Sequence, residues 1–419
     1  MESIRFVKRL FQAYYKNQQK SFPSVSNLLE REFAFVPWEN NIMIRHIGFI
    51  SLDFLTDYLI HNVPKHMYSS ASLYELPGAS KMDSKKYFGC DLIFDIDADH
   101  LDTKCKEKHD FWECESCSQS GVGLSPKLCP NPDCKSTRFK KITWICEECL
   151  ETAKNEIFKL IDGFLEPDFG INKESCFVFF SGHRGYHLHI ENEKLRKLSS
   201  HERREMVDYI TGNNISFTVL GLEKPNIGLG FFNQYVASWP RKIMLKLKEI
   251  LSIENEEELK NNLSNFSLNK EQIGTIIKER KHIIDNIESQ SKNYWNLLGF
   301  GIKSWKSLFF NLVKSIGTDI DIPVTIDIHR LIRYPGSLHG SSGFKVVGIE
   351  YKNLESFDPF SDPVIFSKKN FLKLEITVPE VPKIRVREIT WGPFKLGEVL
   401  DLPHDIGIFL LCKNVATLK

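Results

Sequence analysis

Three short segments of this 419-residue chain carry the side chains that phosphoryl chemistry on divalent metal ions requires. The first holds two aspartates in an apolar run, the second is a glycine-flanked turn followed by a histidine, and the third adds another aspartate with cationic partners. Carboxylates bind Mg²⁺ or Mn²⁺, and arginine and histidine bind phosphate oxygens. Together the segments predict two-metal nucleotidyl transfer. Their polar residues are Asp95 and Asp97; Ser181, His183, Arg184 and His187; and Asp327, Arg333 and His339.

The two aspartates of the first segment are expected on a strand over residues 91–97. Side chains two residues apart on a strand share a face, so Asp95 and Asp97 lie side by side while the apolar residues between them face the core. Two such carboxylates repel each other unless a cation lies between them. One alternative is a pair of exposed acids on an outer strand. Another is a phosphatase of the haloacid dehalogenase type, which places Thr or Val where this chain has Asp99.

The second segment is expected to join a strand over residues 176–180 to one over 186–190. Gly182 and Gly185 permit a tight turn whose amides face an anion, and Arg184 offers a forked donor for phosphate oxygens. A plain hairpin with polar side chains is the alternative. Beside a strand with two aspartates, phosphate binding is the better interpretation.

The third segment is dense in polar groups within apolar surroundings. Asp327 is expected to complete a three-carboxylate metal site, and Arg333 and His339 are expected to hold a triphosphate. Taken alone, the segment is better interpreted as a capping aspartate with basic surface residues. The functional interpretation depends on all three segments together.

Seven cysteines and one histidine between residues 105 and 149 have the spacing of zinc ligands. The inner four cysteines form a zinc-ribbon pattern, and the outer three cysteines need a histidine to complete a second site. The prediction is two closed structural zinc sites, with one site and spare cysteines as the alternative. The expected ligand sets are Cys105, His109, Cys146 and Cys149, and Cys114, Cys117, Cys129 and Cys134.

Composition sets limits on the class of protein. Apolar residues make up 42% and charged residues 26% of the chain, which is ordinary for a globular protein, and the formal net charge is only +1. Any nucleic-acid binding must therefore use local positive charge. No segment reaches the ~18 apolar residues of a membrane helix, and the N-terminus lacks the apolar core of a signal peptide. A cytoplasmic protein with reduced cysteines is expected.

The periodicity of apolar residues predicts an α+β protein with two insertions. The catalytic core is expected over residues 1–100, 150–199 and 317–419, with a zinc-binding module over 101–149. Residues 200–316 are rich in Lys, Glu, Asn and Leu, and they form a helical insertion. The helices expected in it cover residues 241–251, 254–263 and 271–289.

The order and spacing of these motifs resemble the catalytic small subunits of archaeal and eukaryotic DNA primases, and the residues after Asp97 look more archaeal. The resemblance covers most of the chain. The matching segments are Leu92–Asp97, Ser181–His187, Asp327–Gly340, the cysteines between the first two, and Arg31-Glu32-Phe33 with Ile44-Arg45. One departure is His183, where eukaryotic members often carry Arg. Another is a cysteine insertion with more ligands than a single zinc needs.

The resemblance implies an archaeo-eukaryotic primase-type core with mixed or antiparallel sheets, and template-directed synthesis of primers on single-stranded DNA from NTPs or dNTPs. It further implies two Mg²⁺ or Mn²⁺ ions, structural Zn²⁺ and a primase large subunit as partner. A repair primase-polymerase and a non-catalytic zinc-ribbon protein that binds nucleic acid are the alternatives. The implied metal ligands are Asp95, Asp97 and Asp327, and the implied nucleotide ligands are Arg45, Ser181, His183, Arg184, His187, Arg333 and His339.

Overall fold

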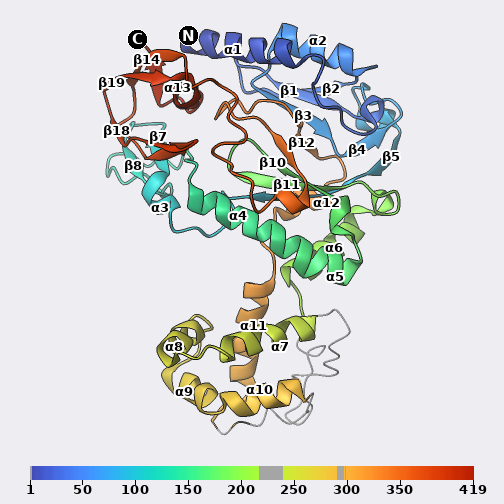
Figure 1. The fold of residues 1–419 in the computed structure, drawn as a ribbon, viewed down its shortest axis with the longest axis vertical. Helices are drawn as coiled ribbons and strands as arrows, with labels where there is room; N and C mark the ends of the chain where they lie inside the picture. Colours follow the sequence, from blue (N-terminus) through green and yellow to red (C-terminus); the bar gives the residue numbers. More distant parts are fainter. Residues whose placement is uncertain (1, 217–238, 290–296, 298) are drawn as a thin grey trace. The chain divides into compact units, whose positions relative to one another are not determined.

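The chain folds into two compact units, each described here by itself (Figure 1). The computed structural model describes residues 2–216, 239–289, 297 and 299–419. Unit 1 contains residues 1–158, 172–203 and 320–419, and unit 2 contains residues 159–171 and 204–319. Helices and antiparallel sheets both contribute to the described part of the chain, so the predicted α+β class is confirmed. Among these residues, no helix is both long and apolar enough to span a bilayer.

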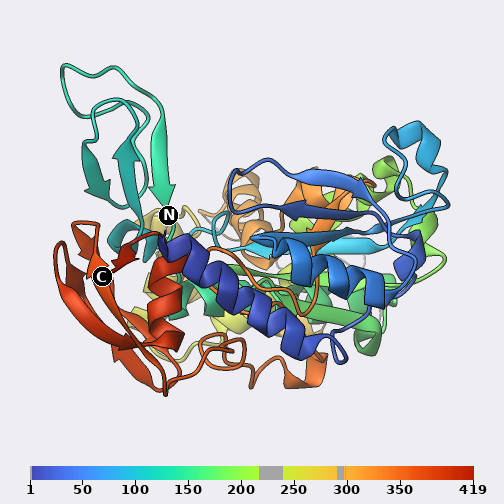
Figure 2. The same ribbon diagram turned by 90° about the horizontal axis from the view of Figure 1, so that it is seen from above.

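The first sheet of unit 1 is built near the N-terminus. Helices α1 (Glu2–Gln18) and α2 (Leu52–Asn62) run along one face of it (Figures 1 and 2). Apolar side chains fill this contact; the rings of Phe35 and Tyr58 lie 4.6 Å apart. In spatial order its four antiparallel strands are β12 (Leu331–Arg333), β3 (His66–Ser70), β1 (Phe33–Val36) and β2 (Ile44–Ile47).

The second sheet of unit 1 carries the predicted two-aspartate strand. In spatial order its strands are β13 (Val347–Ile349), β10 (Cys176–Phe180), β11 (Gly185–Ile190) and β6 (Leu92–Asp97). Helix α4 (Glu147–Leu160) runs beside this sheet (Figure 1). The register places Asp95 opposite His187 and Asp97 opposite Gly185. A Cβ on Gly185 would overlap the Ile96 carbonyl and lie 2.8 Å from the Asp97 Cα, so only glycine permits this approach.

Smaller elements complete unit 1. The cysteine-rich segment forms a three-stranded sheet, and the C-terminal segment forms another with a buried helix, α13. Their bounds are β7 (Phe111–Cys114), β8 (Ser120–Val122), β9 (Phe139–Ile142), α3 (Lys106–His109), β14 (Phe371–Ile376), β19 (Val399–Pro403), β20 (Ala416–Leu418) and α13 (His404–Cys412). Two-stranded pairs are β4 (Ser72–Tyr74) with β5 (Tyr87–Cys90), β15 (Glu380–Val381) with β18 (Phe394–Lys395), and β16 (Ile384–Val386) with β17 (Ile389–Trp391).

Unit 2 is helical over its described residues, with a core around Trp305 and Phe309. The single helix expected over residues 271–289 is wrong, because Glu279 leaves the helical conformation and ends one helix before the next begins. Residues 217–238, 290–296 and 298 of the predicted insertion lie outside the described residues. The helices are α5 (Glu166–Phe169), α6 (Ser200–Thr211), α7 (Trp239–Leu251), α8 (Glu256–Ser264), α9 (Lys270–Lys278), α10 (Arg280–Glu288) and α11 (Ile302–Ile316).

Candidate active site

A cavity of about 380 Å³ lies between the two main sheets of unit 1. Strands β6 and β11 provide one wall, and β3 and β12 provide the other. The cavity therefore brings together side chains that the sequence places hundreds of residues apart. Of the predicted residues, those that line it are Asp95, Asp97, Ser181, His183, His187, Arg333 and His339.

The carboxylates of Asp95 and Asp97 share one face of β6, as their spacing predicts, and both are half-buried. Burial, followed by the negative charges of Asp97 and Asp321, raises the pKa of Asp95 to about 7. The positive charges of Arg330 and Arg333 oppose this shift. A carboxylate that is costly to ionise beside other acids is a site where a divalent cation would stabilise the charged form.

The third carboxylate beside Asp95 belongs to Asp321 and not to Asp327. The Asp321 amide donates a hydrogen bond to the Asp95 carbonyl oxygen at 2.8 Å, and the Asp321 charge acts on the Asp95 carboxyl. Asp327 is exposed at the far end of helix α12 (Ile322–Ile326), where its carboxylate accepts the His329 amide at 2.8 Å. The short helix separates the two acids, and the structure places Asp321, rather than Asp327, next to Asp95.

The turn over Ser181–Gly185 presents its polar groups to the cavity. The Ser181 hydroxyl accepts the Gly185 amide at 3.3 Å, and the Ser181 amide donates to the Gly185 carbonyl at 2.9 Å. Gly182 has a φ of +79°, and a Cβ there would lie 2.9 Å from the His339 Cβ. The tight turn thus brings its residues against the third segment, as the two glycines predict.

Several histidines of the cavity are held in the neutral form. The rings of His183 and His339 stack at 4.7 Å between centroids. Burial, together with neighbouring cations, lowers the pKa of both residues well below the usual value. Burial, followed by the neighbouring His189, lowers the pKa of His187 in the same way, and its Nε2 is buried without a hydrogen-bond partner in the part of the chain that the structure describes. Such an atom is expected to bond to a ligand or water.

Two residues that sequence reasoning missed hold these groups in place. Lys413 Nζ and His183 Nε2 are hydrogen-bonded at 2.6 Å. Burial, with the positive charge of Arg184, lowers the pKa of Lys413 to about 7. His66 Nδ1 accepts from Arg333 Nη1 at 2.9 Å. Neither residue belongs to a recognisable motif, and only the fold brings them to the cavity.

Two predicted nucleotide ligands lie elsewhere. Arg45 is exposed on β2, and its Nε pairs with Glu32 at 3.1 Å. The Arg184 side chain is fully buried, and its Nη1 pairs with Asp99 at 2.8 Å and with Asp110 at 3.2 Å. Neither side chain is among those that line the cavity. The Arg184 side chain is held away from the cavity lining by its ion pairs with Asp99 and Asp110.

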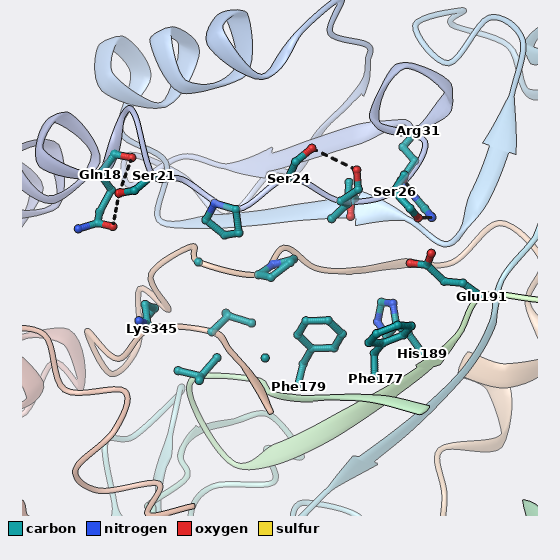
Figure 3. A pocket seen from close by; sticks show the side chains of 18 of the residues that line it. Gln18, Ser21, Ser24, Ser26, Arg31, Phe177, Phe179, His189, Glu191 and Lys345 are labelled. Atoms are coloured by element: carbon teal, nitrogen blue, oxygen red, sulfur yellow. Dashed lines mark hydrogen bonds between the residues drawn. The ribbon is translucent and has the colours of Figure 1, made fainter. Parts of the chain in front are cut away.

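A second, larger pocket of about 470 Å³ adjoins the same sheet. Figure 3 shows Phe177, Phe179 and His189 facing Ser24 and Ser26 across it. Its Arg31 is already committed to Asp91 at 2.6 Å, and Lys345 is the other cation among its lining residues. An aromatic and hydroxyl-lined pocket with one uncommitted cation does not suit a triphosphate. The smaller cavity therefore remains the candidate active site. A hydrogen bond of 3.0 Å joins His187 Nδ1, which lines the smaller cavity, to His189 Nε2, which lines the larger pocket.

Both predicted metal-ligand sets assemble in the structure. We call Cys105, His109, Cys146 and Cys149 the His109 cluster, and Cys114, Cys117, Cys129 and Cys134 the ribbon cluster. Within each set the ligand atoms all lie within 4.8 Å of one another. The backbone amides of Ser116 and Cys117 contribute to lowering the pKa of Cys114 to about 6, which favours the thiolate that binds metal. Each cluster can hold a structural metal ion.

Comparisons with known proteins agree with this geometry. A family model described as DNA primase small subunit matches residues 130–349. The DNA primase small subunit of Methanosarcina barkeri is 31% identical over 99% of this chain and 96% of its own length. That of Archaeoglobus fulgidus is 31% identical over 98% of both chains, and that of Halobacterium salinarum is 29% identical over 98% of this chain and 97% of its own.

The fold and the comparisons together define a nucleotidyltransferase of the primase class. The chain belongs to the DNA primase small subunit family, and the relatives named above are archaeal. Its function is that of the catalytic subunit of a DNA primase. The resemblance drawn from the three motifs is thereby confirmed.

Proposed function

We propose that this chain makes short primers on single-stranded DNA by joining NTPs or dNTPs and releasing pyrophosphate, with all the chemistry in unit 1. One observation carries the proposal: Asp95 and Asp97 line a cavity together with a half-buried arginine, Arg333, and neutral histidines, and the charge of Asp321 acts on Asp95. A cation site and an anion site face each other there. This is the arrangement that transfer of a nucleotide from its triphosphate requires.

The carboxylates are assigned to the metal ions. Asp95, Asp97 and Asp321 would hold two Mg²⁺ or Mn²⁺ ions, and the raised pKa of Asp95 marks a site that favours a cation. When bound, such ions lower the pKa of an attacking 3′-hydroxyl and neutralise charge on the departing pyrophosphate. Asp327 is left out of this set because it is exposed beyond α12 and is not among the charges that act most strongly on Asp95.

The cationic and neutral polar groups that line the cavity are assigned to the triphosphate. Arg333 supplies positive charge, and its guanidinium is oriented by His66 and lies 5.0 Å from the centre of the Tyr68 ring. His187 Nε2 and the His339 ring offer neutral donors for phosphate oxygens. The Ser181 hydroxyl, which lines the same cavity, completes the anion site. No protein nucleophile is required, because the 3′-hydroxyl of the growing primer attacks the α-phosphate.

The partners follow from membership of the family. We propose a single-stranded DNA template, acting in the cytoplasm, and a primase large subunit that forms a heterodimer with this chain. Lys140 and Lys141 on β9 of the ribbon are exposed or half-exposed cations suited to the template backbone.

The two four-ligand clusters are assigned to two structural Zn²⁺ ions, since thiolate and imidazole are the ligands that zinc prefers.

Synthesis on an unprimed template tests the proposed activity. Purified protein is incubated with oligo(dT), Mg²⁺ or Mn²⁺, and labelled ATP or dATP, beside an Asp95→Ala/Asp97→Ala control. Short products that vanish in the control support template-directed initiation at these carboxylates. Extension of an added primer without initiation would support the repair primase-polymerase, or an initiation step that needs the large subunit. Template and zinc binding without either reaction would favour the non-catalytic ribbon protein.

Zinc analysis tests the ribbon cluster. Cys114→Ser is expected to lower the zinc content from about two ions to about one per chain and to lower the melting temperature, because a closed structural site contributes to folding. Ser116→Ala, in the same loop, serves as the matched control and is expected to keep both ions. The measurement is elemental analysis of the purified proteins. Unchanged zinc in Cys114→Ser would remove this site.

A further inference from the structure

The buried arginine of the nucleotide-binding turn, Ser181–Gly185, joins the turn to a metal-ligand cluster. Arg184 Nη1 donates to Asp110 Oδ2 at 3.2 Å and pairs with Asp99 at 2.8 Å. Its Nε and Nη2 are enclosed without a hydrogen-bond partner among the described residues. The sulfur of Cys149 is close enough to attract the guanidinium. A zinc ion with three thiolates and one imidazole is anionic, so Arg184 is the natural counter-charge for the His109 cluster.

Asp110 is shared between the cluster and the arginine. Its Oδ1 accepts His109 Nδ1–H at 2.8 Å and the Trp144 amide at 2.9 Å, while its carboxylate also receives Arg184. This leaves His109 Nε2 pointing toward the Cys149 sulfur at 3.5 Å, as a metal ligand would. A carboxylate that orients a ligating histidine through its other nitrogen is a recurrent feature of zinc sites. Here the same carboxylate also binds Arg184 of the nucleotide-binding turn.

The backbone of the turn links Arg184 to the residues that line the cavity. The Arg184 carbonyl accepts the Ala98 amide at 2.9 Å, next to the carboxylate strand. Directly before it, Ser181 and His183 line the cavity. A shift of the Arg184 side chain therefore displaces groups that face the triphosphate, and a misplacement of even about 1 Å is costly for binding and catalysis.

We propose that the His109 cluster positions the nucleotide-binding turn through Asp110 and Arg184, so that zinc in this cluster and nucleotide in the cavity stabilise each other. The inference rests on the proposed function of the cavity. It makes Asp110 and Arg184 positioning residues and not nucleotide ligands. By linkage, zinc must favour nucleotide binding by the same factor by which nucleotide favours zinc.

The first test separates positioning from folding. The full-length zinc-loaded protein carries Asp110→Asn or His109→Cys, and ATP binding in Mn²⁺ is measured by calorimetry without template. His109→Cys keeps four zinc ligands but removes the imidazole that bonds to Asp110. Both variants are expected to keep two zinc ions and to bind ATP roughly tenfold or more weakly. Asp133→Asn, beside the ribbon cluster, is the matched control and is expected to change neither quantity.

The second test measures the effect of nucleotide on the release of zinc. Zinc release to a chromogenic chelator is followed with and without Mn²⁺–ATP. Nucleotide is expected to slow release of one of the two ions in the native protein, and this protection is expected to disappear in His109→Cys. Wild-type ATP affinity in both variants, with no protection of zinc by nucleotide, would overturn the proposal. If Asp110→Asn loses zinc on purification, His109→Cys decides alone. Native protein that binds no ATP at all would instead refute the proposed function.

Discussion

Asp321→Asn is expected to abolish primer synthesis, whereas Asp327→Asn, six positions later in the chain, is expected to leave it nearly intact. Asp321 adds its charge to the Asp95 site, and its amide bonds to the Asp95 carbonyl. Loss of one charged ligand from a two-metal centre is expected to lower the rate by roughly 10²–10³-fold or more. The measurement is the initial rate of dinucleotide formation on oligo(dT) at saturating nucleotide.

The Asp327 variant is a closely matched control. Asparagine keeps the side-chain oxygen that accepts the His329 amide at 2.8 Å, so the end of α12 should be preserved. Its activity is expected within about threefold of the native protein, with a stability change no larger than the ~1 kcal/mol of one hydrogen bond. Melting curves of both variants show whether the fold survives. An active Asp321→Asn beside an inactive Asp327→Asn would restore the assignment made from the sequence.

The contrast between these two aspartates shows where sequence reasoning ends. Both are acids within a few residues of a proline in the same apolar stretch, and residue type alone does not separate them. The five-residue helix between them decides which one faces Asp95. By comparison, Asp95 and Asp97 were placed on one face by the two-residue period of a strand, which any half-buried sheet imposes.

The metal-ligand clusters were predictable for a similar local reason. Paired cysteines two residues apart form a ligand loop whatever surrounds them, and the two sets assembled as their spacing predicts. The residues assigned to the triphosphate were predictable only in part. Lys413 lies 230 residues from the histidine it contacts, and His66 lies 267 residues from Arg333. Such contacts arise from the packing of distant elements and leave no local pattern in the sequence.

The motif also did not predict the direction in which the Arg184 side chain points. The sequence Ser-Gly-His-Arg-Gly predicts a tight turn with a cation, but two adjacent residues of that turn face opposite ways. His183 faces the cavity, and Arg184 faces Asp110. An arginine beside glycine suggests phosphate binding until a buried carboxylate near it is known. The ion pairs, and not the motif, give the side chain its role.

Asp95→Asn is expected to make the metal-free protein more stable while removing its activity. The pKa of Asp95 is about 7 in the folded protein against 3.8 for the free side chain. Between those values the folded state binds a proton that the unfolded state releases, so metal-free stability falls as pH rises through this window. Above about pH 7 the folded protein must hold an unfavourable charge. Asparagine has the same shape and carries no charge, so it removes this cost.

Thermal unfolding in chelator measures the effect. At pH 8 the variant is expected to melt a few degrees above the native protein, since about 1 kcal/mol moves the midpoint of a domain of this size by roughly 2–4 °C. The difference should shrink as the pH falls and should close only below about pH 3.8, where Asp95 is protonated in both the folded and the unfolded state. An exposed control, Asp401→Asn on β19, is expected to show no such pH-dependent gain.

Addition of Mn²⁺ should reverse the order of stability at pH 8. A ligand that binds only the folded state stabilises it by an amount that grows with its concentration over Kd. The native protein is expected to gain this stabilisation, and Asp95→Asn is expected to gain little. On the proposed assignment, the charge that destabilises the metal-free protein is the charge that binds the cation. A variant that melts below the native protein in chelator, or that gains equally from Mn²⁺, would contradict Asp95 as a metal ligand in a desolvated site.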